Sequence, residues 1–248
     1  MKRLLTIRMV LTVVLLASLS SCKKNKENAG EGIYTGNYRY IDLGLPSGTL
    51  WATFNLGADR PEGFGDYFAW GEITTKSFYN WYTYKYCLGD DETQMTKYCF
   101  ESWYGYGHDE YGYNGFTDSL TVLQPEDDAA TVRWGSDWCM PTREQWYELR
   151  DNTTITYTTI RGVNGCLCTG RNGQNIFLPC AGWHIYGNAA DVGEEGHYWS
   201  SSIDPTHTTS AIGFGILHPQ ANDPDDFYYV STSARCQGRS IRAVRARH

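Results

Sequence analysis

The hydrophobic positions of this chain come mostly in short runs bounded by glycine, proline, asparagine or aspartate. Such runs favour short β-strands separated by turns. We expect strands at 40–44, 50–53, 66–71, 153–160, 166–169, 175–180, 198–201, 210–217, 227–233 and 240–245. Many short strands joined by turns suit antiparallel pairing, so the pattern predicts an α+β fold of twisted antiparallel sheets with long loops.

Two segments predict short helices beside these strands. Residues 129–134 follow a proline and three acidic residues, which complement the positive end of a helix dipole. A second helix should begin after Thr142, which can cap it, with Gln145 at the reciprocal position of a capping box, and run to about Asp151. Trp146 and Leu149 lie three residues apart and should therefore face the core.

Residues 72–125 show no clear period and are dense in Tyr, Trp, Gly and Asp. We expect an irregular aromatic insertion that packs in part on the body. A loop of this length is uncommon unless it carries function or its own small structure.

The N-terminus has the features of an export signal followed by a lipidation site. Lys2 and Arg3 precede an apolar run that is too short to span a bilayer, and Cys22 follows two serines. We expect 1–21 to be a lipoprotein signal peptide, with Cys22 lipidated. An ordinary secretory signal is the alternative. Residues 22–37 are then a flexible tether and 38–248 one folded domain.

This reading places the protein in the cell envelope, lipid-anchored in a membrane and most simply in the outer one. Whether it faces the surface or the periplasm stays open, although three lysines near Cys22 favour the inner face. The formal charge of −7 becomes −10 when Lys2, Arg3 and Arg8 are removed with the signal. An acidic chain repels phosphate backbones, which argues against nucleic acid as a partner.

Seven cysteines remain beyond Cys22, and their pairing cannot be read from the sequence. A Cys87–Cys99 disulfide and buried free thiols are both open alternatives. The histidines show no paired helical spacing, so a zinc site is not expected. The acidic loops at 90–92 and 222–226 could offer oxygen ligands to calcium, but a solvated acidic loop is the favoured interpretation. We therefore predict no metal and no cofactor.

Several segments, taken in order, resemble the Fibrobacter succinogenes major paralogous domain family of Bacteroides-type lipoproteins. The similarity covers about residues 38–246. The segments that carry it are 41–48, 51–53, 65–72, 125–130, 138–142, 162–165, 177–179, 198–202 and 240–245. The chain departs from the family pattern at Cys139, at His184 and Ile185, and at Ala243.

The resemblance implies a C-type-lectin-like fold, related to the formylglycine-generating enzyme, and no established activity. Those enzymes need a pair of redox-active cysteines near the C-terminal region, where this chain has only Cys236. No paired carboxylates, nucleophile elbow or phosphate loop stands out either. The sequence therefore predicts that the protein is not an enzyme.

The remaining interpretation is a binding or adhesion module for a carbohydrate or protein ligand. Most tryptophans lie beside glycines and strand ends, which is typical of core anchors: Trp51, Trp70, Trp134, Trp138, Trp146 and Trp199. Loops should then carry recognition, and the expected ligand residues are Trp183, His184, Tyr186, Asp223, Asp225 and Asp226. A structural subunit of an envelope assembly is the alternative, and an enzyme ranks last.

Overall fold

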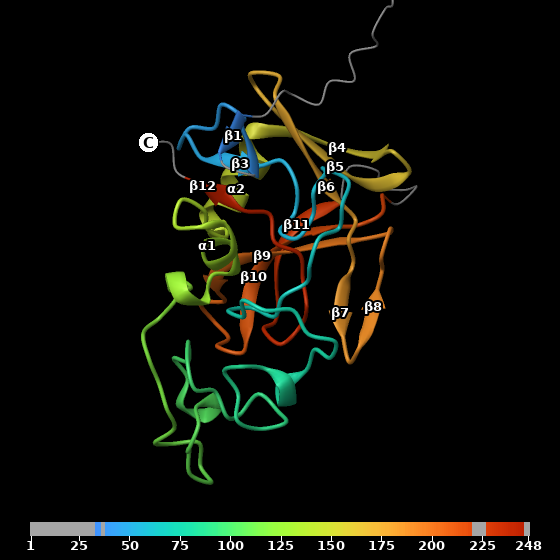
Figure 1. The fold of residues 1–248 in the computed structure, drawn as a ribbon. Coiled ribbons are helices and arrows are strands. Elements are labelled where there is room, and N and C mark those ends of the chain that lie inside the picture. Colours follow the sequence, from blue (N-terminus) through green and yellow to red (C-terminus); the bar gives the residue numbers. More distant parts are fainter. Residues whose placement is uncertain (1–32, 36–37, 220–226, 246–248) are drawn as a thin grey trace, which may run out of the picture.

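Three antiparallel sheets and one separate hairpin make up the β structure of the residues that the structure describes (Figure 1). The computed structural model describes residues 33–35, 38–219 and 227–245. The strands are β1 (Ile33–Thr35), β2 (Tyr38–Asp42), β3 (Leu50–Ala52), β4 (Thr153–Ile160), β5 (Val163–Gly170), β6 (Asn175–Pro179), β7 (Trp183–Ile185), β8 (Asn188–Ala190), β9 (Gly196–Ile203), β10 (Ser210–Ile216), β11 (Tyr228–Ala234) and β12 (Val244–Arg245). The class is thus α+β with mostly antiparallel sheets.

The sheets have the orders β1-β2-β3-β12, β11-β10-β9 and β4-β5-β6, and β7 pairs with β8 alone. In Figure 1 the β9–β10–β11 sheet lies near the centre, and the sheet that contains β1, β3 and β12 lies at one end with α2. Every residue of β9 is buried, so this strand is covered on both faces. The segment 72–125 extends from the opposite end of the body.

Both predicted helices are present, and their caps explain where they begin. Asp128 caps α1 (Ala129–Trp134): its Oδ1 accepts the amides of Ala130 and Thr131 at 2.9 and 3.0 Å. Thr142 and Gln145 form the predicted capping box at the start of α2 (Arg143–Asn152). Trp146 and Leu149 are buried, so α2 packs on the body through the face that the sequence indicated.

The segment 72–125 is irregular, as expected, and contains the short 3₁₀ turns η1 (Trp81–Thr83) and η2 (Ser102–Tyr104). A third such turn, η3 (Pro125–Asp127), leads into α1.

One strand prediction was wrong, and another was wrong in part. Residues 66–71 form no ladder, although Phe68 and Trp70 are buried, because the backbone here bonds to a loop: their amides donate to the carbonyls of Arg239 and Arg235. In 240–245 only β12 is a strand, because the preceding residues form hydrogen bonds with several separate segments and not with one neighbouring strand. The amides of Ala52 and Leu56, for example, bond to carbonyls of that stretch.

The hairpin β7–β8 was missed by the sequence analysis, which treated residues 183–186 as a loop. Tyr186 and Gly187 both have positive φ, at 48° and 78°, and this is the backbone that a two-residue hairpin turn requires. Glycine is expected at such a position, but tyrosine rarely adopts it, which hid the turn.

The tryptophan prediction is confirmed in its main part. Two hydrophobic clusters form the core. The fully buried tryptophans are Trp51, Trp70, Trp138, Trp146 and Trp199, while Trp134 is half-buried and packs against the first cluster. The seven cysteines from Cys87 to Cys236 are free thiols, and all but Cys139 are buried. Within the described ranges, no helix is long and apolar enough to cross a bilayer.

Candidate functional site

The hairpin β7–β8 lies against the first part of the aromatic insertion, so two regions that the sequence singled out meet. The backbone of His184 exchanges two hydrogen bonds with Gly238, at 2.8 and 2.9 Å. The His184 ring packs on Tyr67 and Tyr79, with centroids 4.2 and 5.8 Å apart. Burial lowers the pKa of His184. This histidine therefore positions the hairpin within the protein.

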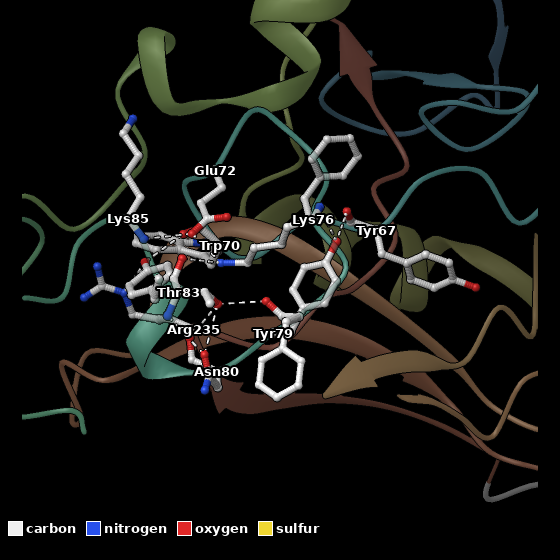
Figure 2. Close-up of polar contacts among 12 residues, drawn as sticks. Tyr67, Trp70, Glu72, Lys76, Tyr79, Asn80, Thr83, Lys85 and Arg235 are labelled. Carbon is white, nitrogen blue, oxygen red and sulfur yellow. Dashed lines mark hydrogen bonds and ion pairs between the residues drawn. The ribbon is translucent and has the colours of Figure 1, made fainter. Parts of the chain in front are cut away.

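Figure 2 shows the polar contacts that anchor the start of the insertion. Lys76 Nζ donates to Glu72 Oε1 and to the Thr83 carbonyl, both at 2.8 Å. The Lys85 amide donates to the same Glu72 oxygen at 2.8 Å. The Tyr79 hydroxyl donates to the Tyr67 carbonyl at 2.6 Å. Together these bonds fix the turn that supports the hairpin.

Two exposed rings result from this contact. Tyr186 at the hairpin turn is 60% exposed, and Phe78 of the insertion is 44% exposed. Their centroids lie 6.3 Å apart in an edge-to-face arrangement, and the Tyr186 amide donates to the Tyr79 carbonyl at 3.0 Å. The contact thus places two large rings side by side at the surface, and contiguous exposed apolar surface often marks a binding site.

A second group of exposed rings lies farther along the insertion, and we call it the aromatic tip: Trp103, Tyr106, Tyr111, Tyr113 and Phe116. Trp103 stacks on His108 with centroids 5.6 Å apart. Asp109 accepts the amides of Tyr111 and Tyr113 at 3.0 and 2.9 Å, which holds the turn between them. The tip is therefore ordered by its own hydrogen bonds while its rings face solvent.

A buried network fixes the insertion to the body. Asp127 accepts hydrogen bonds from Lys85 (3.0 Å), Lys97 (2.6 Å), Tyr98 (2.7 Å) and Tyr86. Burial by itself would raise the pKa of Asp127, but these four donors outweigh it and lower the pKa to about 2.

Arg235, also fully buried, completes the network from the C-terminal side. Its guanidinium donates to the Tyr84 hydroxyl and to the carbonyls of Lys97, Tyr98 and Thr208, at 2.8–3.0 Å. It also lies over the Trp70 ring, 5.0 Å from the centroid. One side chain thus joins the insertion to the core.

At the base of the hairpin lies a cluster of acidic and imidazole groups, which we call the acid–histidine cluster: Asp191, Glu195 and His197. One potential ligand atom from each residue lies within 4.8 Å of the others. His197 Nε2 is 2.9 Å from Glu195 Oε2, and Asp191 Oδ2 accepts the Trp183 Nε1 hydrogen at 2.9 Å.

The electrostatics of this cluster follow from burial beside a buried arginine. Burial first and the positive Arg239 second lower the pKa of His197 to about 4, although Asp191 opposes them. Burial and the charges of Asp191 and Glu194 raise the pKa of Glu195. At neutral pH the imidazole is therefore neutral and the carboxylates repel each other.

The residues predicted from the sequence have different places. Tyr186 is exposed, Trp183 is half-buried and bonded to Asp191, and His184 is packed against two tyrosines. Asp223, Asp225 and Asp226 lie outside the described residues. Sequence reasoning missed Phe78, the aromatic tip and the acid–histidine cluster. The spacing Asp-x₃-Glu-x-His at the entry to a strand was the available signal for the last.

No family model, no curated protein and no solved structure matches this chain.

Proposed function

We propose that the protein is a non-enzymatic binding module that recognises a glycan through the exposed aromatic rings of its insertion and hairpin. One observation carries this proposal. In the described part of the chain, every exposed aromatic side chain except Tyr147 lies on the insertion or at the hairpin turn. The core already contains its own buried rings, so packing does not account for these.

The chemistry of the aromatic tip favours a sugar over a purely apolar partner. All of its large exposed hydrophobic side chains are aromatic. The residues between them are glycine, aspartate, asparagine, glutamate and histidine, apart from Tyr104, which packs against the core. Aromatic faces stack on the apolar faces of sugar rings, and neighbouring polar groups bond to hydroxyls. A protein ligand, or a structural role in an envelope assembly, is the second candidate, because exposed rings also mark protein interfaces.

The finer fold assignment belongs to the same proposal. We place the α+β body in the C-type-lectin-like class on the strength of the segment order that resembles the Fibrobacter succinogenes major paralogous domain family. Two helices beside antiparallel sheets, with a long insertion that presents side chains, are compatible with that class. In such an arrangement recognition lies on the loops.

Replacing Tyr111 and Tyr113 together by alanine should weaken glycan binding by about tenfold or more. Their side chains are 71% and 67% exposed, so stability should change by less than about 1 kcal/mol. A glycan array identifies the ligand, and calorimetry compares the variant with the wild type. Tyr147→Ala is the matched control, because this ring lies on α2, away from the insertion.

Two results would contradict the glycan proposal. One is equal loss of binding in Tyr147→Ala and in the double variant. The other is an array without any signal, with and without calcium. If a pull-down then recovers neighbouring envelope proteins through the same rings, the structural role replaces the glycan-binding role.

We further propose that the module is tethered to a membrane of the cell envelope, in the first instance the outer membrane, through lipidated Cys22. Cys22→Ala should move the protein from the membrane fraction to the soluble fraction and abolish labelling with a fatty-acid analogue. Cys139→Ala is the matched control, because Cys139 is an exposed thiol in the folded part. Continued labelling of the Cys22→Ala protein would refute the lipid anchor.

A further inference from the structure

We propose that Asp191, Glu195 and His197 form a binding site for one divalent transition-metal ion, with zinc as the first choice. The three potential ligand atoms lie within 4.8 Å of one another. Ligands about 2.1 Å from a tetrahedral zinc lie about 3.4 Å apart. Asp191 is exposed and Glu195 is half-buried, so small side-chain rotations can close the remaining difference.

His197 brings a buried imidazole nitrogen to the two carboxyl groups. Its side chain is only 7% exposed, and its Nε2 faces Glu195. Its Nδ1 is buried and has no hydrogen-bond partner among the described residues. A buried imidazole normally has partners at both nitrogens, because an unpaired buried polar atom is costly. The metal would bind Nε2 in place of its hydrogen bond to Glu195, and the single ring proton of the neutral imidazole would move to Nδ1.

The loop between β8 and β9 is held in a shape that keeps the two carboxylates together. The Glu195 amide donates to the Asp191 carbonyl at 2.8 Å, and the Glu195 carbonyl accepts the Gly182 amide at 2.7 Å. The Gly193 amide donates to the Cys180 carbonyl at 2.8 Å. The loop is thus fixed to the body on both sides of the cluster.

The Trp183 indole supports the site from outside. Its N–H donates to Asp191 Oδ2, and its ring lies edge-on to His197 with centroids 6.2 Å apart. Such outer contacts orient metal ligands. Asp191 and Glu195 have no Lys or Arg ion-pair partner in the described ranges, although the positive charge of Arg239 acts on His197.

The donor set selects the class of metal. Magnesium and calcium prefer oxygen ligands alone, whereas imidazole suits zinc, iron, nickel and copper. Three protein ligands with an exposed carboxylate leave at least one coordination position open to solvent. The inference does not rest on the proposed function, because it follows from the cluster alone.

The test is a titration of the purified full chain with zinc, followed by calorimetry, and with cobalt, followed by absorption. We expect Asp191→Asn to bind one equivalent fewer than the wild type, and Trp183→Phe to bind about 10- to 100-fold more weakly. The cobalt spectrum should lack the charge-transfer band of a thiolate ligand, which distinguishes this site from the free cysteines. Glu194→Gln, an exposed neighbour outside the trio, removes a nearby charge but no ligand, so it should weaken binding far less than Asp191→Asn does.

His197→Gln removes a buried side chain and is therefore compared only if it unfolds like the wild type. Asp191 is exposed, so Asp191→Asn should fold whatever happens to the other variant. Zinc binding that is unchanged in Asp191→Asn would overturn the proposal, as would a cobalt spectrum dominated by thiolate or no zinc binding by the wild type. Zinc binding by the wild type together with no binding on the glycan array would support the metal site and contradict only the proposed glycan-binding function.

Discussion

Arg235→Met is expected to destabilise the protein by about 4 kcal/mol. The variant would leave the Tyr84 hydroxyl and the carbonyls of Lys97, Tyr98 and Thr208 without their donor. Each buried acceptor left unpaired costs about 1–3 kcal/mol, and relaxation recovers part of that sum. Arg235→Lys should restore only a minor part of the lost stability, because a lysine ammonium lacks the planar guanidinium geometry that reaches four acceptors.

Urea unfolding measures the decrease in the free energy of unfolding of Arg235→Met, and amide hydrogen exchange shows which segments become less stable. Because Arg235 holds the backbone at Lys97 and Tyr98, exchange should accelerate most across the insertion. Arg171→Met is the matched control, since Arg171 is exposed at the turn between β5 and β6. Unfolding of Arg235→Met at the wild-type urea midpoint would show that the network does not depend on this guanidinium.

Asp127→Asn is expected to cost about 3 kcal/mol. The carboxylate is buried and accepts from two lysines and two tyrosines. Its neutral replacement removes the counter-ion of Lys85 and leaves Lys97 with only the longer contact to Glu126, at 3.7 Å. Asp90→Asn, an exposed aspartate of the same insertion, should change stability by less than about 0.5 kcal/mol. Equal urea midpoints for the two variants would contradict the role given to Asp127.

The same carboxylate should make stability depend on pH. Its folded pKa of about 2 lies below the unfolded value of about 3.8, so the folded state favours the charged form. The stabilisation, about 2 kcal/mol, is complete above the unfolded pKa and is lost as the pH falls through about 2. The stability difference between wild type and Asp127→Asn should therefore shrink between about pH 4 and pH 2. A constant difference over that range would refute the assignment.

The local features were predictable because local physics decides them. The capping box at Thr142 and the strands at 153–160 and 175–179 depend on neighbouring residues and on alternation along the chain. The buried tryptophans were also predictable, because large rings beside glycines at strand ends usually anchor a core.

The candidate sites were less predictable because distant residues build them. The supports of the acid–histidine cluster come from Gly182 and Trp183, and Phe78 meets Tyr186 only after the insertion folds against the hairpin. The sequence shows that the aromatic tip is rich in aromatic residues. It does not show that these rings are exposed, because composition alone does not distinguish buried rings from exposed ones. Residues 66–71 looked like a strand since they are apolar, yet their partner is a loop.

Residues 238–244 form backbone hydrogen bonds with segments that are far away in the sequence. Arg239 and Phe68 exchange two backbone hydrogen bonds, Gly238 pairs with the hairpin, and Val244 pairs with Cys139. Contacts of such long sequence separation form late and slowly. These three pairings therefore cannot form until residues 238–244 have emerged from the ribosome.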